Sequence, residues 1–413
     1  MSSGFIEGLG ILVINAGSSS FKYQVLDMRS EQGLCQGLVE RIGSRDSVLK
    51  HKRYPGTDRE QSYTYPGEYA THAAGMKAMF KIMFDRELGG VLDSEKAIGA
   101  VGHRVLLAGP GYSEVLVDEH IKQVIREYGP LGPLHNPANL AGIDVIEELF
   151  PELPNVAVFD TGFHSTLPEE AYTYAIPVDL AEKHKIRRYG YHGTSHRYVR
   201  RVAAGLLKMS TTQANLITCH LGNGCSICAI GGGKSLDTSM GLTPLEGLVM
   251  GTRSGSIDPA IVTYLAEQEG FTATELNALF NKKSGLLGLC GKSDMRDILE
   301  ARQNGDVRAD LAFKVFVYSI RKHIGMYYPV LGRVDGIVFT GGIGENSAQV
   351  RSAVCKDMGV LGISLNEVLN SQQSSEARII SSGKTKTKVM VVPTNEELEI
   401  ARATVRVIAS RYV

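Results

Sequence analysis

The 413-residue sequence predicts a duplicated α/β fold. Residues 11–26 (ILVINAGSSSFKYQVL) and residues 215–230 (NLITCHLGNGCSICAI) share one design. In each segment a short apolar strand ends in a polar residue, a tight loop of Gly, Ser or Asn follows, and a second β-rich run begins. Such loops expose backbone N–H groups with little side-chain bulk, so they bind anions and phosphate above all. Two of them in one chain indicate a duplication with a nucleotide between the halves.

Length and composition suit two domains. A chain of 413 residues is too long for one ordinary core, and its 43% hydrophobic and 21% charged residues are typical of a globular protein. The 44 basic and 44 acidic residues balance, which removes the electrostatic reason to expect nucleic acid or an anionic membrane as partner. No apolar run approaches the roughly 18–20 residues that span a bilayer. The N-terminal residues lack a basic signal-peptide start, so we expect a cytoplasmic protein.

The expected elements alternate strand pairs with helices, twice along the chain. The first half contains a strand pair at 11–27, an amphipathic helix at 138–150 and a buried strand at 156–159 that runs into Asp160. The second half contains, in order, a strand pair from residue 215, an amphipathic helix at 311–328, a strand at 336–340, the run GGIGEN at 341–346, a polar loop at 370–376, a strand at 388–392 and a helix that begins near Asn395. We place the first lobe at residues 1–160 plus 397–413 and the second, nucleotide-binding lobe at 161–396.

Two motifs resemble known sites but have simpler explanations. Residues 231–235 (GGGKS) end like a P-loop, yet Cys228 stands where that motif needs its first Gly, and no helix pattern follows. We therefore predict a hairpin turn there. Cys225 and Cys228 form a C-x-x-C, but residues three apart on a strand point to opposite faces, and no second pair completes a zinc site.

The run HGTSH places His192 and His196 four residues apart, which on a helix is a zinc-binding spacing. The Glu of a metalloprotease motif is missing and Gly193 lies between the histidines, so a metal-dependent hydrolase has little support. We favour a Gly-flanked loop that presents His192, with a helix beginning near Thr194.

Three arginines lie beside glycines or in turns: Arg104 in GHRV, Arg253 in GTRSGSIDP and Arg296 in SDMR. Glycines let the backbone approach a ligand while a guanidinium binds carboxylate or phosphate through two hydrogen bonds. His135, in PLHNPAN, lies in a loop between prolines. These four side chains are candidates for anion binding.

The start of the last predicted helix combines a structural and a functional signal. Thr394 and Glu397 have the spacing of a capping box, which explains Glu397. The cap does not involve Glu396, and a carboxylate with Asn or Asp partners suits Mg²⁺.

Taken together, these motifs resemble the acetate kinase family, within the superfamily of acetate and sugar kinases, actin and heat-shock ATPases. The resemblance extends from about residue 10 to residue 410. The motifs that carry it occur in the family's order: VINAGSSSFKY, GHRV, PLHNPAN, FDTGFHSTLP, RRYGYHGTSH, HLGNGCS, GLTPLEGLVMGTRSGSIDP, SGLLG, SDMR, GGIGENS and PTNEELEIA.

The resemblance implies a duplicated ribonuclease H-like fold of the actin-like ATPase type, with the nucleotide in the cleft between two lobes. It implies a phosphotransferase that moves the γ-phosphoryl group of ATP directly and reversibly to acetate. It also implies Mg²⁺, for which Mn²⁺ can substitute, a homodimer, and neither nucleic acid nor membrane as partner. The apolar face of helix 311–328 is compatible with a dimer contact, although a core helix has the same pattern.

The family's functional residues carry over to matching positions of this sequence. The metal would be held by Asn15 and Glu396. The ATP contacts would come from Lys22, His220, Leu221, Gly222, Asn223, Gly224, Asp294, Met295, Arg296, Gly341, Gly342, Ile343, Gly344 and Glu345. The catalytic residues would be Asp160, His192, Arg253 and His135, and the acyl substrate would contact Arg104, Leu106, Leu134, Tyr191 and Pro244.

These residue types suit phosphoryl transfer to a carboxylate. The attacking carboxylate is already ionised, so no strong general base is needed. Because two anions approach each other, the reaction depends on in-line positioning and on positive charge around the transferring group.

The acyl pocket departs from the family pattern. The family usually continues GHRV with Val-His-Gly-Gly, whereas this sequence reads Leu106-Leu107-Ala108-Gly109, and Tyr191 replaces the usual Phe. Relatives that prefer propionate tend to carry a small residue at the Leu106 position. Since Leu fills space there, we predict acetate rather than propionate. The alternatives are a propionate or other short-chain acyl kinase and, further away, a non-acyl ATPase of the actin-like superfamily.

Overall fold

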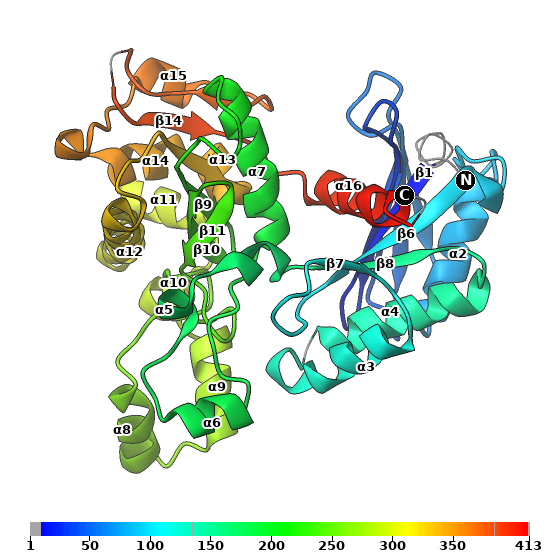
Figure 1. The fold of residues 1–413 in the computed structure, drawn as a ribbon, viewed down its shortest axis with the longest axis horizontal. Coiled ribbons are helices and arrows are strands. Elements are labelled where there is room, and N and C mark those ends of the chain that lie inside the picture. The colour runs from blue at the N-terminus through cyan, green and yellow to red at the C-terminus, as the bar shows by residue number, and fades with distance from the viewer. Residues whose placement is uncertain (1–9, 134, 384, 412–413) are drawn as a thin grey trace. The chain divides into compact units, whose positions relative to one another are not determined.

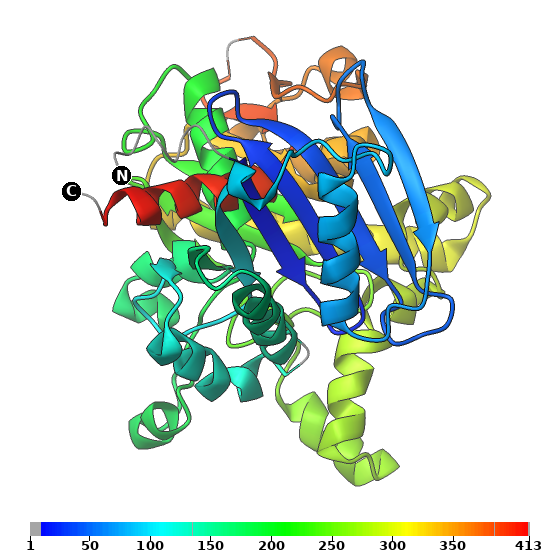
Figure 2. The ribbon, with the colours of Figure 1, turned by 90° about the vertical axis from the view of Figure 1, so that its right-hand side faces the viewer.

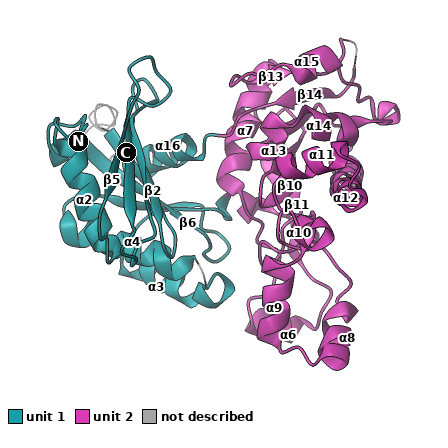
Figure 3. Ribbon diagram, turned by 180° about the vertical axis from the view of Figure 1, so that it is seen from behind, with its two compact units in different colours: residues 1–162, 395–413 teal, residues 163–394 magenta. Residues whose placement is uncertain are grey.

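The computed structural model describes residues 10–133, 135–383 and 385–411. Contacts between Cα atoms divide the chain into unit 1, Met1–Gly162 with Asn395–Val413, and unit 2, Phe163–Thr394 (Figure 3). The lobes expected from the sequence end two residues away from these units, at residue 160 rather than 162 and at 396 rather than 394.

The described residues of unit 1 form an eight-stranded sheet in the order β5-β4-β3-β2-β1-β6-β8-β7. Its strands β1, β6, β7 and β8 are labelled in Figure 1. Its strands are β1 (Gly10–Ala16), β2 (Phe21–Asp27), β3 (Gln32–Glu40), β4 (Val48–Arg53), β5 (Gln61–Pro66), β6 (Ile98–Val105), β7 (Glu114–Leu116) and β8 (Asn155–Phe159). Its helices are α2 (His72–Phe84), η1 (Glu95–Ala97), α3 (Glu119–Glu127), η2 (Gly129–Leu131), α4 (Asn136–Leu149) and α16 (Glu396–Ala409).

Successive side chains of β1 point to opposite faces of the sheet, and different helices cover these two faces. Leu12, Ile14 and Ala16 belong to the core formed with α2 and α4, and Figure 2 shows α2 crossing this face of the sheet. The other face packs against α16, where a β-carbon on Gly102 would collide with Ile400. The polar residues Asn15 and Lys22 therefore lie on the face that α16 shares.

The described residues of unit 2 form a six-stranded sheet in the order β11-β10-β9-β12-β14-β13. Its strands are β9 (Leu216–Leu221), β10 (Cys225–Gly231), β11 (Lys234–Thr238), β12 (Gly336–Thr340), β13 (Arg378–Ile379) and β14 (Lys388–Val391). Its helices are α5 (Glu169–Tyr172), α6 (Val178–Lys183), α7 (Gly193–Leu206), α8 (Ala260–Glu269), α9 (Ala273–Lys282), α10 (Gly285–Cys290), α11 (Met295–Gln303), α12 (Val307–Leu331), α13 (Gly341–Asn346), α14 (Ala348–Cys355), η4 (Gly359–Leu361) and α15 (Glu367–Ser371), while η3 (Gly162–Thr166) joins the units.

The two sheets repeat one topology. In unit 1 the run β3-β2-β1-β6-β8 contains two antiparallel pairs followed by two parallel pairs. In unit 2 the run β11-β10-β9-β12-β14 has the same sequence of directions. The predicted duplication of an actin-like α/β fold is therefore confirmed in the strand pairing itself.

Most local predictions agree with the structure. The GGGKS segment is a hairpin between β10 and β11, in which Gly232 and Gly233 have positive φ of 60° and 78°. Two consecutive positive φ values favour glycine and fit a tight two-residue hairpin turn. Cys225 and Cys228 are free and buried in β10. The run GGIGEN forms the short helix α13 directly after β12.

The predicted start of the last helix changes in one detail. The predicted capping box of Thr394 and Glu397 is wrong, because Asn395 caps α16 by accepting a hydrogen bond from the backbone N–H of Leu398. The Thr394 hydroxyl instead bonds Ser195 Oγ at 2.9 Å.

The apolar face of helix 311–328 belongs to the core of unit 2. Its members are at most 7% exposed: Phe313, Phe316, Val317, Ile320, Ile324 and Tyr327. That face therefore cannot serve as a dimer contact. Of the helices that the structure describes, not one combines the length and the apolar character needed to cross a membrane.

Candidate active site

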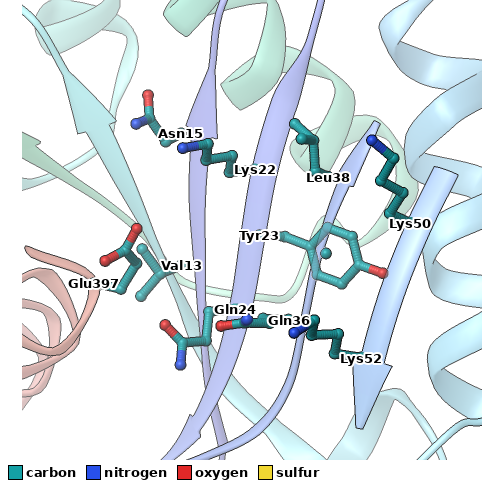
Figure 4. Close-up of a pocket in the computed structure, with 11 residues that line it drawn as sticks. Val13, Asn15, Lys22, Tyr23, Gln24, Gln36, Leu38, Lys50, Lys52 and Glu397 are labelled. Carbon is teal, nitrogen blue, oxygen red and sulfur yellow. The ribbon is translucent and has the colours of Figure 1, made fainter. Parts of the chain in front are cut away.

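A pocket of about 340 Å³ lies on the α16 side of the unit 1 sheet (Figure 4). Asn15 is the penultimate residue of β1, and the strand register places it opposite Lys22 on β2. Figure 4 shows both side chains at one end of the pocket, with the Glu397 carboxylate reaching in from α16. The remaining lining residues are Val13, Tyr23, Gln24, Gln36, Gly37, Leu38, Lys50 and Lys52. The structure thus gathers an amide, an ammonium group and a carboxylate at the first Gly/Ser loop.

A second polar group of unit 1 is built around Arg104. Arg104 lies on β6 and Asp160 directly follows β8, and their side chains form an ion pair at 3.1 Å. The Asp160 side chain is 1% exposed. Burial acts to lower the pKa of Arg104, but Asp160, Glu396 and Glu397 together outweigh it and raise that pKa. Arg104 therefore remains charged, paired with Asp160 and within the electrostatic influence of Glu396 and Glu397.

Leu106, a predicted acyl-pocket residue of unit 1, follows Arg104 by two residues in the sequence. The backbone N–H of Leu106 donates to Asn139 Oδ1 at 3.0 Å, and its side chain packs against Gly132, where a β-carbon would be 2.8 Å from Leu106 Cδ2. His135 is the residue before α4, and its N–H donates to the carbonyl oxygen of Gly132. Leu134 lies outside the described residues.

In unit 2, three predicted residues meet at the loop between β9 and β10. A β-carbon on Gly224 would lie 3.4 Å from Arg253 Nη1 and 3.5 Å from His192 Cε1. These are ordinary contact distances, so the guanidinium and the imidazole lie side by side at this loop position. Gly251 is tighter, since a β-carbon there would collide with the side-chain oxygen of Asn223.

The Arg253 guanidinium has no carboxylate partner within the described part of the chain. Its Nη1 donates to the carbonyl oxygen of Pro244 at 2.9 Å and contacts the sulfur of Met250 at 3.8 Å. Burial lowers the pKa of Arg253, with only a small opposing influence from the Cys225 thiol. A partly buried cation without a counter-ion is a prepared site for an anionic group.

His192 has a strained backbone. Its φ of 57° and ψ of 29° are left-handed, which is uncommon for a residue other than glycine, and it directly precedes α7. Its ring stacks on that of His220, with centroids 4.2 Å apart, and its Nδ1 bonds Ser226 Oγ at 2.9 Å. Such outliers persist where the surroundings determine the conformation, and they cluster at functional sites.

A loop of unit 2 carries the remaining acyl-pocket candidates. Tyr191 is 1% exposed, and its hydroxyl donates to the carbonyl oxygen of Leu242 at 2.8 Å. Pro244, two residues further on, accepts the hydrogen bond from Arg253. The loop is anchored by Arg188, whose guanidinium pairs with Glu246 at 2.8 Å.

A pocket of about 550 Å³ in unit 2 brings together the predicted nucleotide residues from three segments. Its lining is Gly222, Asn223, Ser293, Asp294, Met295, Arg296, Leu299, Gly342, Ile343, Asn346 and Ser347. At its rim, hydrogen bonds from Arg296 lower the pKa of Asp294 to about 2. His220 and Leu221 lie within β9, and Gly341 and Gly344 pack against that strand's end. Glu345 does not line the pocket, because its carboxylate accepts hydrogen bonds from the backbone N–H groups of Gly341 and Thr394.

Several residues of these sites were missed from the sequence. Ser293, Leu299, Asn346 and Ser347 line the nucleotide pocket, and each lies within four residues of a predicted contact. Glu397 was assigned to a cap that does not form. Ser226 occupies an ordinary strand position, and only the register of β10 against β9 shows that it faces His192.

The chain is an ATP-dependent phosphotransferase, because three features meet in a duplicated actin-like fold. These are the Gly222–Gly224 loop, the pocket beside it, and Arg253, which has no carboxylate partner among the described residues. Comparison with known proteins narrows this class. The acetokinase family matches residues 10–402, and the chain belongs to this family.

Named relatives agree over nearly the full chain. The acetate kinase of Nitratidesulfovibrio vulgaris strain Miyazaki F is 54% identical over 401 residues, which cover 97% of this chain and 99% of that protein. The crystal structure of Porphyromonas gingivalis acetate kinase has a TM-score of 0.92 at 42% identity and covers 97% and 100% of the two chains. A propionate kinase from Francisella tularensis has a TM-score of 0.88 at 41% identity and covers 96% and 99%.

Proposed function

We propose that this protein catalyses the reversible transfer of the γ-phosphoryl group of ATP to acetate, with acetyl phosphate and ADP as products. The observation that carries the proposal is the Arg253 guanidinium beside His192 and Gly224, without a carboxylate partner among the described residues. The acetate kinases among its relatives support the choice of acceptor.

In this proposal each polar group has one task. The pocket around Asn223 and Asp294 holds the nucleoside, and the Gly222–Gly224 backbone binds its phosphates. Arg104, oriented by Asp160, binds the acetate carboxylate. Arg253 and His192 donate hydrogen bonds to the equatorial oxygens of the transferring group, where negative charge accumulates.

The reaction itself is a direct displacement. A lone pair of the acetate carboxylate forms a new O–P bond as the bond between the γ-phosphorus and the bridging oxygen breaks, and that electron pair leaves on ADP. No proton has to be removed from the nucleophile, because a carboxylate is already ionised.

The test is formation of acyl phosphate from Mg-ATP, trapped with hydroxylamine, with acetate, propionate and butyrate compared at equal concentrations. We expect acetate to have the highest kcat/KM by about tenfold, which is the discrimination that one methylene group provides. Preference for propionate would support the short-chain alternative. ATP hydrolysis without acyl phosphate would support the non-acyl ATPase.

Leu106→Ala tests the origin of this preference. Leu106 is 4% exposed and packs on Gly132, so truncation leaves space for about two further carbon atoms. We expect the kcat/KM for propionate relative to acetate to rise by about 10- to 100-fold. Leu107→Ala is the matched control, because Leu107 is equally buried but its neighbour in sequence carries the contact with Gly132. An unchanged ratio in Leu106→Ala would exclude Leu106 from the acyl pocket.

Mg²⁺ fits the polar groups of unit 1. Glu396 and Glu397 act electrostatically on Arg104, and Glu397 shares a pocket with Asn15, which supplies an amide oxygen. Nucleotide-bound Mg²⁺ takes one or two protein ligands plus waters and phosphate oxygens. Within the described residues no three His, Cys, Asp or Glu side chains are grouped to hold a metal. When bound, the ion neutralises phosphate charge, and Mn²⁺ can replace it.

We expect Glu396→Gln to raise the Mg²⁺ concentration for half-maximal activity by about tenfold or more, because the carboxylate charge is lost at constant shape. Glu397→Gln is the matched control on the same helix turn. A larger effect of Glu397→Gln would indicate that Glu397, which lines the pocket with Asn15, is the metal ligand instead of Glu396.

We further propose a cytoplasmic homodimer. Unit 2 exposes large apolar side chains that its core does not use, among them Tyr318 at 64% and Met326 at 49% on α12, and Tyr264 at 63% on α8. A protein contact would cover these side chains if they adjoin in one apolar patch. Light scattering should give about twice the 44.8 kDa chain mass, and a monomer at micromolar concentration would contradict the proposal.

A further inference from the structure

A run of buried hydrogen bonds connects His192 to the interior of unit 2. His192 Nδ1 bonds Ser226 Oγ at 2.9 Å, the same oxygen bonds His196 Nε2 at 2.7 Å, and His196 Nδ1 bonds Thr218 Oγ1 at 2.7 Å. Ser226, His196 and Thr218 are each 0% exposed, so bulk water does not compete for these bonds.

The fold explains why these side chains meet. His192 and His196 are one helical turn apart at the start of α7, so both point to the same side. Thr218 and Ser226 lie on the sheet face that packs against α7, because alternate residues of β9 and β10 share a face and the register places Ser226 opposite His220. The run is therefore a product of the core packing of unit 2.

Counting protons decides the direction of the bonds. Burial lowers the pKa of His196 well below its usual value, with smaller contributions from His164 and His220, so His196 is neutral and carries one ring proton. Each hydroxyl also has only one hydrogen to donate. If Ser226 accepts one bond of the run and donates the other, two arrangements are self-consistent, one with all protons directed towards His192 and one with all directed away from it.

The end of the run selects between them. If the protons pointed away from His192, the Thr218 hydroxyl would have to donate elsewhere, and its other acceptor is the carbonyl oxygen of Cys228 at 3.5 Å. That distance is well beyond a good O–H···O bond, whereas His196 Nδ1 lies at 2.7 Å. The favoured order is therefore Thr218 to His196 Nδ1, His196 Nε2 to Ser226, and Ser226 to His192 Nδ1.

We infer that Ser226 and His196 are positioning residues that make Nδ1 of His192 a hydrogen-bond acceptor and so keep a proton on its Nε2. Position 224 shows where that proton is used, since a β-carbon there would be 3.6 Å from His192 Nε2 and 3.4 Å from Arg253 Nη1. With the proton on Nε2, His192 and Arg253 both donate to the same place. With the other tautomer, a nitrogen lone pair would face the phosphoryl oxygens and repel them. The inference rests on the proposed role of His192 in phosphoryl transfer.

The first test is the tautomer itself, read from the ¹⁵N and ¹H ring signals of ¹⁵N-histidine-labelled enzyme, with His192 assigned by its loss in His192→Asn. We expect the wild-type resting enzyme to carry the proton on Nε2. A proton on Nδ1 would overturn the inference whatever the catalytic activity is, and the wild-type spectrum needs no variant to fold.

The second test is Ser226→Ala. We expect its His192 to become a mixture of tautomers and kcat to fall by about tenfold to a hundredfold, with the KM for ATP and for acetate within about twofold. Ser235→Ala is the matched control, because Ser235 is also 0% exposed and bonds a different buried histidine, His164 Nδ1, at 2.8 Å. It should retain both the His192 tautomer and kcat.

The outcomes separate the inference from the proposed function. Unchanged tautomer and kcat in Ser226→Ala would overturn the inference while acyl phosphate formation by the wild type still stood. Failure of the wild type to phosphorylate any carboxylate would overturn the proposed function. The tautomer measurement would still decide whether Ser226 and His196 keep a proton on His192 Nε2. Equal losses in Ser226→Ala and Ser235→Ala would indicate a general packing defect and overturn the positioning role.

Discussion

Arg253→Ala is expected to lower kcat by about 10³-fold or more while the KM for ATP changes by only a few-fold. The guanidinium lies against Gly224, has no carboxylate partner among the described residues, and is held by the carbonyl oxygen of Pro244. Such a group stabilises charge that is largest in the transition state, so its loss raises the barrier more than it weakens binding of the ground state. Steady-state kinetics with saturating acetate measure the two constants.

Two further variants define the effect. Arg253→Lys should recover little activity, because one ammonium group cannot donate in the planar, two-point geometry of a guanidinium. Arg296→Ala should show the opposite split, a raised KM for ATP with kcat nearly unchanged, since Arg296 lies at the rim of the nucleotide pocket and pairs with Asp294. A loss in Arg253→Ala that is confined to KM would remove Arg253 from the transition state.

The elements with strong periodicity were predictable from the sequence. The two strand-loop-strand segments recur as β1-β2 and β9-β10, and helix 311–328 recurs inside α12. Apolar alternation and helical spacing indicate which side of a strand or helix is buried. Burial of that side stabilises these elements, so their type and position can be predicted. The same pattern could not say what covers the apolar face of α12, because a core and a dimer contact have the same chemistry.

The capping error has a specific physical cause. Thr394 and Asn395 are both good N-cap residues, and the Thr394–Glu397 spacing favoured the first. In the fold, the Thr394 hydroxyl bonds Ser195 and its N–H donates to Glu345, so both groups serve tertiary contacts. Asn395 then caps the helix, and the Glu397 side chain is released into the pocket with Asn15.

The candidate site also contains residues that the sequence indicates and residues that it does not. The residues proposed to contact a ligand lie in loops with unusual Gly, Arg or His content, and this content is visible in the sequence. Residues that act through other residues leave no local signal. Ser226 is one polar residue in the strand CSICAIG, and its importance depends on the register of β10, the turn of α7 and the neutrality of His196.

His192→Asn is the second variant with a large expected effect, and it separates catalysis from stability. The φ of 57° at His192 is unfavourable for most side chains, but Asn adopts left-handed conformations several-fold more readily. The Asn carboxamide also reproduces the Nδ1 end of the imidazole and can keep the bond to Ser226, while the Nε2 donor is lost. We expect kcat to fall by about 10²-fold, as for removal of one oxyanion donor.

The unfolding temperatures of two His192 variants test whether loss of activity and loss of stability are separate. His192→Asn should unfold at or above the wild-type temperature, because it relieves a left-handed backbone that costs on the order of 1–3 kcal/mol in an unsuitable residue. His192→Val should unfold at a lower temperature, since a branched β-carbon tolerates that φ poorly. Parallel loss of activity and stability in His192→Asn would mean that His192 acts through the fold. Loss of activity with stability retained would mean that the strain at residue 192 serves to aim the imidazole at the phosphoryl group.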